Sequence, residues 1–246
     1  MSHSVNTTLL EVQQELDELR AQHSQFVYAV THDLAGPFRQ IEGFANIIQS
    51  KNSHLFDAKT KRHFDLMISA SERGGAILEA LTDHSRMSIT KASLSHVDCG
   101  EVIAEAIDSL SALIENSNGK ISCNRMPTIA GDSVQLHRLF YHLIHNALLY
   151  RDPDRAPLVL LDATELEGSW QFCVKDNGIG FRDRIGEKIF TPLRRGVRDG
   201  DYPGIGMGLT IARTVVQRHG GSIWSESEEW VGSSFYFTLD KSTRCD

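Results

Sequence analysis

Two glycine-rich segments in the second half of the chain have the residue types of a nucleotide pocket. Residues 176–180 (DNGIG) follow a predicted strand, and residues 204–208 (GIGMG) precede a predicted helix. Glycine lets backbone N–H groups approach a phosphate closely, and a helix N-terminus attracts anions. Neither segment is a Walker loop or a Rossmann fingerprint, because the required residues do not follow at the required spacing. Each alone could be a tight turn. As a pair flanking the charged stretch 182–203, they predict a nucleotide pocket with a mobile lid.

A histidine followed directly by an aspartate could carry nucleophilic chemistry. At about 100° per residue, His32 lies opposite the apolar stripe that includes Leu34, so we expect His32 to be exposed. The neighbouring carboxylate of Asp33 favours the tautomer with a free ring nitrogen. A surface His-Asp pair is more often only solvated, so these two residues alone leave both interpretations open.

The predicted helix from Asp132 to Tyr150 has a polar face beside its buried stripe. The expected buried stripe consists of Leu136, Leu139, Leu143 and Ala147. His142, Asn146 and Leu149 share the neighbouring face at i, i+4 and i+7. An asparagine at that place could offer its carbonyl oxygen to Mg²⁺. The alternative is an asparagine that bonds only to the backbone.

The first half of the chain has the apolar spacing of paired helices. Heptad-spaced apolar residues occur at Val5, Leu9, Val12, Leu16, Leu19, Phe26 and Val30. A seam this narrow is most simply buried against the same helix of a second subunit, although a lone amphipathic helix lying on its own domain is the alternative. Pro37 interrupts the continuing stripe and predicts a bend, and residues 51–54 predict a loop. A second helix, capped by Asp57 and reaching about Met87, would complete a hairpin, and two hairpins make a four-helix bundle.

From about residue 93 the pattern changes to that of an α+β layer domain. Helices are predicted over 101–115, 132–150 and 209–219, and strands over 158–163, 170–174, 222–225 and 234–239. The polar stretch 88–96 marks the boundary between the two parts.

Composition excludes several classes of protein. The 246-residue chain has a net charge of −7, which argues against a broad nucleic-acid-binding surface. No apolar run is long enough to cross a bilayer, and no signal peptide is visible. The four cysteines have no C-x-x-C spacing, which makes a zinc site or a disulfide framework improbable. These features predict an acidic cytoplasmic protein.

In this order, the motifs resemble the conserved boxes of sensor histidine kinases of two-component systems, with some likeness to the bacterial phytochrome type. Residues 26–37 resemble the H box, 139–147 the N box, 176–180 the G1 box, 189–193 the F box and 204–209 the G2 box. The resemblance covers nearly the whole chain. It implies a dimeric helical-hairpin domain, forming a four-helix bundle, followed by an α/β-sandwich ATP-binding domain of the Bergerat type, which gyrase and chaperone ATPases share.

The resemblance also assigns domains and site residues. Residues 1–25 would be a coiled-coil signalling helix, 26–90 the dimerisation and histidine phosphotransfer domain, and 91–246 the catalytic ATP-binding domain. His32 would attack the γ-phosphorus of ATP, Asp33 would accept its proton, and Asn146 would hold Mg²⁺. Asp176 would accept a hydrogen bond from the adenine amino group. The other nucleotide-binding positions would be Tyr150, Gly178, Gly180, Gly204, Gly206, Gly208 and Leu209. The implied partners are a second copy of the chain, a response-regulator receiver domain and an upstream sensor module or protein, since only about 25 residues precede the H box.

Three residues depart from the family pattern. The N box commonly has Asn at the position of His142 and Lys at that of Leu149, and a lost lysine removes a charge-assisted phosphate contact. Arg151, Arg194, Arg195 or Arg198 could replace that charge. Gly36 stands where many members that dephosphorylate their partner carry Thr or Asn, which predicts weak phosphatase activity. The departures keep open a non-kinase phosphotransfer or scaffold protein with a degenerate ATP domain. A gyrase- or chaperone-like ATPase is disfavoured because its general base would be a Glu at position 142.

Overall fold

The computed structural model describes residues 2–89, 93–182, 186–194, 202 and 204–241. The chain divides into two compact units, Met1–Lys91 and Ala92–Asp246, and each is described by itself. None of the helices in the described part of the chain combines the length and the apolar character that a bilayer crossing requires.

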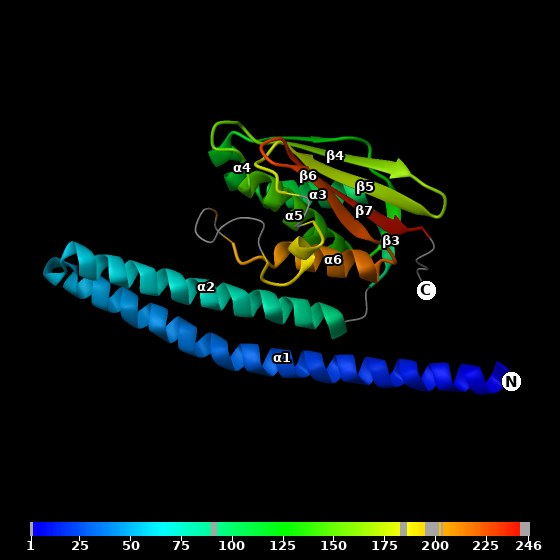
Figure 1. The fold of residues 1–246 in the computed structure, drawn as a ribbon, viewed down its shortest axis with the longest axis horizontal. Helices are drawn as coiled ribbons and strands as arrows, with labels where there is room; N and C mark the ends of the chain where they lie inside the picture. Colours follow the sequence, from blue (N-terminus) through cyan, green and yellow to red (C-terminus); the bar gives the residue numbers. More distant parts are fainter. Residues whose placement is uncertain (1, 90–92, 183–185, 195–201, 203, 242–246) are drawn as a thin grey trace. The chain divides into compact units, whose positions relative to one another are not determined.

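The first unit is a helical hairpin. Helix α1 spans Ser2–Asn52, a 3-10 helix spans Ser53–Leu55 and helix α2 spans Ala58–Ile89. Helix α1 continues through Pro37, where a bend was expected, and it curves along its length (Figure 1). Proline removes one backbone hydrogen bond, which a 51-residue helix packed along a partner tolerates. The predicted loop at 51–54 is wrong: the chain there remains helical until Leu55.

The two helices of the hairpin meet through small and hydroxyl-bearing residues. The Ser85 hydroxyl donates to the Ser24 carbonyl at 2.7 Å, and the Thr82 hydroxyl donates to the Thr31 hydroxyl at 2.7 Å. Farther along, the Ser71 hydroxyl donates to the backbone of α1 at 2.7 Å. The buried residues described in α1 are Ser24, Thr31 and Ala45, which are spaced by seven and then by fourteen positions. Hydroxyl contacts of this kind fix the register of the hairpin but bury little apolar surface.

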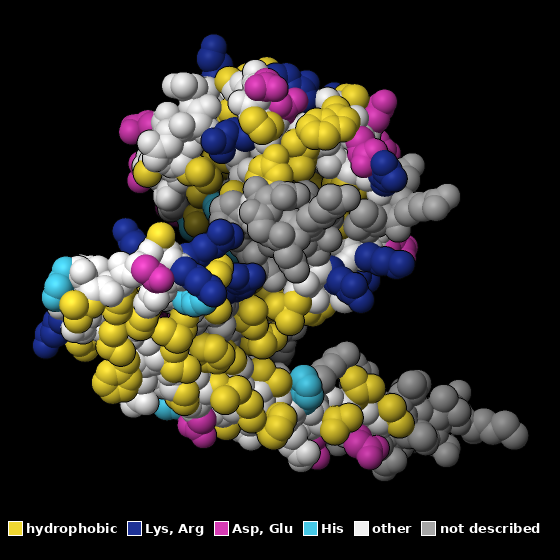
Figure 2. Space-filling view, turned by 60° about the vertical axis from the view of Figure 1, so that its left-hand side comes forward, with side chains coloured by type: hydrophobic (Ala, Val, Ile, Leu, Met, Phe, Trp, Pro, Cys, Tyr) yellow, Lys and Arg dark blue, Asp and Glu magenta, His cyan; other side chains and the backbone are white. Residues whose placement is uncertain are grey.

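Many large apolar residues of the hairpin face away from this contact, although Leu78 is buried and the Phe38 ring lies against Gly74. Leu19 is 65% exposed and Phe26 is 67% exposed, and the other described members of the heptad seam are exposed as well. The exposed apolar surface continues through Leu34, Ile41, Phe44, Ile48, Leu66 and Met67. Figure 2 shows these hydrophobic side chains gathered over the hairpin. A contiguous apolar surface of this length marks an interaction surface.

The second unit is a five-stranded sheet with helices on one face (Figure 1). Its elements are β1 (Ser95–Asp98), α3 (Cys99–Asp108), α4 (Ser111–Ser117), β2 (Lys120–Cys123), β3 (Thr128–Gly131), α5 (Ser133–Leu149), β4 (Leu158–Glu165), β5 (Ser169–Asp176), α6 (Gly208–Arg218), β6 (Ile223–Glu228) and β7 (Gly232–Asp240). A 3-10 helix spans Lys188–Phe190. The sheet has the order β2-β4-β5-β7-β6, with β2 parallel to β4 and the other neighbours antiparallel. Strands β1 and β3 form a separate antiparallel pair.

The core lies between the sheet and helices α3, α5 and α6. Phe140 of α5 packs edge-on against Phe172 of β5 and Phe237 of β7, with ring centroids 5.8 Å apart in both pairs. The predicted buried stripe of α5 is confirmed, since Leu136, Leu139, Leu143 and Ala147 are all buried. This burial turns the neighbouring face of α5 away from the sheet.

The sequence predictions for this unit fail at its short elements. The single helix predicted over 101–115 is wrong, because α3 ends at Asp108 and α4 begins at Ser111. The Ser109 hydroxyl bonds to the Glu105 carbonyl, and Leu110 turns inward and is buried. Strands β1, β2 and β3 were not predicted. Each has four residues, which is too short for an alternating pattern to stand out.

A buried histidine joins α6 to α5. His219 is 1% exposed; its Nδ1 lies 2.8 Å from the Val215 carbonyl and its Nε2 accepts the Asp132 backbone N–H at 3.1 Å. These bonds require the neutral ring with its proton on Nδ1. Burial lowers the pKa of His219 below its usual value of 6.5.

We expect His219→Leu to lower the free energy of unfolding by about 1–3 kcal/mol, because it leaves the Asp132 backbone N–H without its partner, while the Val215 carbonyl keeps the backbone N–H of residue 219 as a donor. Chemical denaturation measures this, and His96→Leu on exposed strand β1 is the control. In the unmodified chain, the His219 contribution to stability should be lost as the pH falls below about 6.5, because the unfolded histidine then binds a proton that the folded one resists. A denaturation midpoint unchanged by His219→Leu would contradict this role.

Candidate nucleotide-binding site

The polar face of α5 lies against the second glycine segment. The Asp132 side chain caps α5 by accepting the Gln135 backbone N–H at 3.0 Å. A Cβ added to Gly208 would lie 3.2 Å from His142 Nδ1, and one added to Gly204 would lie 3.7 Å from Leu149 Cδ2. Residues 142 and 149, predicted to share a face, therefore both face the segment 204–208.

Asn146 lies on the same face, one turn after His142. Its side chain is half-buried, and its carboxamide makes no hydrogen bond to any other described residue. The alternative that Asn146 only bonds to the backbone is therefore not supported within the described part of the chain. The carboxamide oxygen is available for a ligand.

His142 brings no positive charge to this face. Burial lowers its pKa to about 4, and the nearby His145, Arg138 and His137 lower it in the same direction. At neutral pH the ring is uncharged. With Asn146 and Leu149 beside it, this turn of α5 presents a neutral surface to the glycine segment.

Among the described residues, none takes up the first backbone N–H groups of α6, which leaves them available for an anion. The helix begins at Gly208, and no side-chain hydrogen bond is made by its N-cap residue, Met207. Gly206 has a left-handed φ of 74°, and a Cβ there would lie 2.7 Å from the Arg194 carbonyl oxygen. The segment can take this path only with glycine at that position. Leu209, the second residue of α6, is half-buried.

Asp176, the last residue of β5, is held by backbone donors. Its Oδ1 accepts the N–H of Gly178 at 2.8 Å and that of Ser233 at 3.1 Å. Burial raises the pKa of Asp176 to about 6, and the two hydrogen bonds lower it. Because both bonds use Oδ1, Oδ2 is left for a ligand donor.

The loop after Asp176 packs tightly against the backbone of two other segments. A Cβ on Gly178 would clash with the Tyr150 carbonyl oxygen, and one on Gly180 would clash with the Glu228 carbonyl oxygen. The Ile179 N–H donates to the Tyr150 carbonyl at 3.0 Å. The loop therefore contacts both Tyr150, at the end of α5, and the end of β6.

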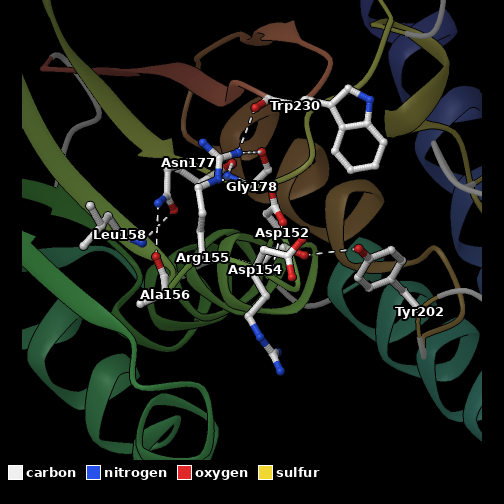
Figure 3. A network of polar contacts seen from close by, with 11 residues as sticks. Asp152, Asp154, Arg155, Ala156, Leu158, Asn177, Gly178, Tyr202 and Trp230 are labelled. Carbon is white, nitrogen blue, oxygen red and sulfur yellow. Dashed lines mark hydrogen bonds and ion pairs between the residues drawn. The ribbon is translucent and has the colours of Figure 1, made fainter.

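The stretch 182–203, predicted to be a lid, is described only in part. Residues 183–185, 195–201 and 203, including Arg195 and Arg198, lie outside the described residues. In the described part, Ile189 and Phe190 are buried, and the Thr210 hydroxyl of α6 donates to the Phe190 carbonyl at 3.2 Å. The Tyr202 hydroxyl donates to the Arg151 carbonyl at 3.1 Å (Figure 3).

A polar network that the sequence did not predict surrounds the loop 176–180 (Figure 3). The Asn177 side chain accepts the Leu158 N–H at 2.7 Å and donates to the Ala156 carbonyl at 3.1 Å. Arg155 bonds to Asp152 and to the Trp230 carbonyl. Apart from Asn177, which belongs to the segment 176–180, these residues belong to no motif, and their signal in the sequence is the turn composition of residues 151–157.

The histidine-aspartate pair lies in the other unit, on α1. The His32 side chain is 74% exposed, as predicted, and its Nδ1 lies 3.4 Å from Asp33 Oδ1. The ring also contacts that of Tyr28, one turn earlier, with centroids 6.2 Å apart.

Comparison with known proteins gives the family. Residues 131–243 match the family described as histidine kinase-, DNA gyrase B- and HSP90-like ATPase. The chain is 29% identical over 231 residues to the phytochrome-like protein Cph1 of Synechocystis, covering 94% of this chain and 31% of that protein. It is 29% identical over 240 residues to the methanogenesis regulatory histidine kinase FilI of Methanothrix harundinacea, covering 93% and 26%. The chain thus spans less than a third of either relative.

The fold also matches a solved histidine kinase. The structure of histidine kinase ThkA in complex with the response regulator protein TrrA superposes with a TM-score of 0.64 at 20% identity, covering 94% of this chain and 67% of that one. A helical hairpin followed by an α/β ATPase domain is common to both. The chain therefore contains a histidine kinase catalytic core, and its residues 131–243 form the ATPase domain of that core.

Proposed function

We propose that this chain is an ATP-dependent protein-histidine kinase of a two-component system, which phosphorylates His32 and passes the phosphoryl group to an aspartate of a response-regulator receiver domain. One observation carries the proposal. An exposed His32-Asp33 pair occurs in the same chain as an ATPase domain in which Asp176, Asn146 and the uncapped start of α6 border the glycine segments. The kinase would act in the cytoplasm, where ATP and receiver domains occur.

The ATPase domain supplies residues suited to each part of ATP. Asp176 Oδ2 would accept the adenine amino group, and the N–H groups at the start of α6 would bind phosphate oxygens. Tyr150, Gly178 and Gly180 would border the base, while Gly204, Gly206, Gly208 and Leu209 would border the phosphates. The Asn146 carboxamide oxygen fits Mg²⁺, which prefers oxygen ligands. When bound, Mg²⁺ would neutralise charge on the phosphates.

The geometry at His32 supports a defined phosphoryl transfer. With Nδ1–H turned to Asp33 at 3.4 Å, Nε2 keeps its lone pair and attacks the γ-phosphorus. A P–N bond forms, the bond from the γ-phosphorus to the bridging oxygen breaks, and ADP leaves. Asp33 takes up the Nδ1 proton. In the second transfer the P–N bond breaks as the receiver carboxylate attacks. ThkA, whose structure was solved with a response regulator, supports this class of partner.

Incorporation of the γ-phosphate of ATP tests the proposal. Purified chain with Mg²⁺ and γ-labelled ATP should take up label that is stable to base and labile to acid. His32→Ala should abolish the uptake, whereas His23→Ala, at another exposed position of α1, should retain it. If the wild-type chain binds ATP but takes up no label, the scaffold interpretation replaces this one. The neutral face of His142 and Leu149 is the observation that favours that second candidate.

We also propose that the chain forms a homodimer through the apolar face of the hairpin, and that an upstream sensor module or protein drives α1. The heptad seam lies outside the hydroxyl-rich contact between α1 and α2, so a second hairpin can cover it. Residues 1–25 would continue the pairing as a coiled coil, with residues 26–90 forming the bundle and 91–246 the ATP-binding domain.

We expect Phe26→Glu to weaken the dimer at least about tenfold, because burial of one phenylalanine contributes about 1.5–3 kcal/mol. Light scattering across a concentration series measures the dissociation. Gln25→Glu adds the same charge at the neighbouring exposed position off the seam and should have little effect. A monomeric wild-type chain at high concentration would refute the dimer.

A further inference from the structure

Arg155 belongs to none of the motifs, yet its guanidinium joins three segments around the loop 176–180 (Figure 3). Its Nε donates to Asp152 Oδ2 at 3.1 Å, within the turn that follows α5. Its Nη2 donates to the Trp230 carbonyl at 2.8 Å and lies 3.5 Å from the Gly178 carbonyl. The turn after α5, the loop after β5 and the turn between β6 and β7 therefore meet at one side chain.

Two of these three segments hold the Asp176 carboxylate. The N–H groups that donate to Asp176 Oδ1 belong to Gly178 and to Ser233, just after the turn that contains Trp230. The two segments are also tied to each other, because the Trp230 N–H donates to the Ile179 carbonyl at 2.7 Å. A displacement of either segment would move one donor away from the carboxylate.

The conformation of Trp230 needs outside support. Its φ of 67° is in the left-handed region, which is unfavourable for a bulky residue, and its side chain is 65% exposed. Burial of the indole therefore cannot hold the turn. Both backbone polar groups of Trp230 are engaged instead, the N–H with Ile179 and the carbonyl with Arg155.

An arginine suits this position because its planar guanidinium donates in several fixed directions at once. Asp152, which is largely buried, accepts a hydrogen bond from the guanidinium and so orients it. Asp152 is itself held in place, because its Oδ1 accepts the Asp154 backbone N–H at 2.9 Å. A lysine at position 155 could reach one of these acceptors but could not bridge them in the same geometry.

We propose that Arg155 is a positioning residue for adenine recognition. It fastens the two backbone segments that hold Asp176 Oδ1, and so fixes the direction in which Oδ2 meets the base. This role rests on the proposed function, since it requires an adenine nucleotide at Asp176. Adenine carries an amino donor where guanine carries a carbonyl acceptor, so a well-fixed carboxylate should favour ATP over GTP.

Nucleotide titration of Arg155→Ala and Arg155→Lys tests the role. We expect the Kd for ATP to rise about tenfold in Arg155→Ala, with GTP affinity nearly unchanged, so that the preference for ATP falls by the same factor. Arg155→Lys should keep the charge but restore little of the preference. Arg125→Ala is the matched control, because Arg125 is an exposed arginine between β2 and β3 and makes no described hydrogen bond to the loop 176–180.

Amide hydrogen exchange of the nucleotide-free chain gives a second measurement. The amides of Gly178, Ile179, Trp230 and Ser233 should exchange faster in Arg155→Ala and at wild-type rates in Arg125→Ala. Unchanged exchange together with an unchanged preference for ATP would overturn the inference. An equal loss of ATP and GTP affinity would overturn it too, because that indicates a general structural role. If the wild-type chain binds no ATP, the proposed function fails, and the exchange rates still decide whether Arg155 holds the loop.

Discussion

Asp176→Asn should lower the affinity for ATP by about a hundredfold or more. Asp176 Oδ1 accepts two backbone N–H groups, so an asparagine would keep its carbonyl oxygen there and turn its NH₂ group toward the ligand. The adenine amino group would then face a donor. The variant loses a hydrogen bond to a charged group and leaves a buried donor without a partner, and together these cost about 3–5 kcal/mol. Calorimetric titration with ATP measures the change.

The control for this variant is Asp154→Asn, which makes the same change of charge on the exposed turn after α5. No described contact joins the Asp154 side chain to the loop 176–180. An Asp176→Asn chain that binds ATP as tightly as the wild type would show that the base is recognised elsewhere.

The pH dependence of binding tests the same carboxylate without a mutation. Burial raises the pKa of Asp176 to about 6, so the group is ionised at pH 7.5 and protonated at pH 5. ATP affinity should therefore fall as the pH drops through about 6. The affinity of Asp176→Asn for ATP should lack this fall near pH 6. Comparing the pH dependence of the variant with that of the wild type removes any effect that comes from titration of ATP itself. Stability has the opposite sign: a raised folded pKa means that the Asp176 contribution is present below about pH 3.8 and is lost as the pH rises through about 6.

The elements that carry the motifs could be predicted from the sequence, because the spacing of residues within one helix or turn follows from local backbone geometry. The α5 stripe follows from helical periodicity. The predicted exposure of His32 is confirmed, although Leu34, on the stripe opposite to it, is exposed in this chain as well. The two glycine segments are recognisable because backbone at Gly206 takes a conformation that other residues disfavour. The structure places the segment 204–208 beside α5, whereas the roles of the individual residues stay predictions.

What could not be predicted depends on contacts between distant segments. Arg155 reads as an ordinary turn residue until β7 brings Trp230 beside it, 75 residues away. The hydroxyl contacts within the hairpin are equally hidden, because Ser85 and Thr82 look like solvated helix positions until α1 covers them. The continuity of α1 through Pro37 also depends on packing. Local sequence gives the cost of one missing hydrogen bond but not the packing along α2 that outweighs it.

Leu149→Lys should raise the affinity for ATP, or the rate of phosphorylation, by about 10–150-fold. The Leu149 side chain faces the glycine segment at Gly204, next to the uncapped start of α6 where we place the phosphates. A lysine of similar reach would add a charge-assisted contact to a phosphate, which is worth about 1.5–3 kcal/mol. Titration with ATP and the initial rate of label uptake measure the two effects separately. Leu149→Met, with similar length and no charge, is the control.

The size of this gain depends on how much positive charge the phosphates already meet. Positions 142, 146 and 149 of α5 offer none, because His142 is neutral and Asn146 and Leu149 carry no charge, although Arg138, one turn earlier, is close enough to lower the pKa of His142. If the gain is large, residues 142 and 149 limit the kinase activity of the wild-type chain. The double variant His142→Asn, Leu149→Lys should then show a larger gain in ATP affinity or phosphorylation rate than either single variant. If Leu149→Lys behaves as Leu149→Met does, positive charge reaches the phosphates from elsewhere. Arg151 and Arg194 are then the described side chains to remove first, since both lie in segments bonded to the lid or to the glycine segment.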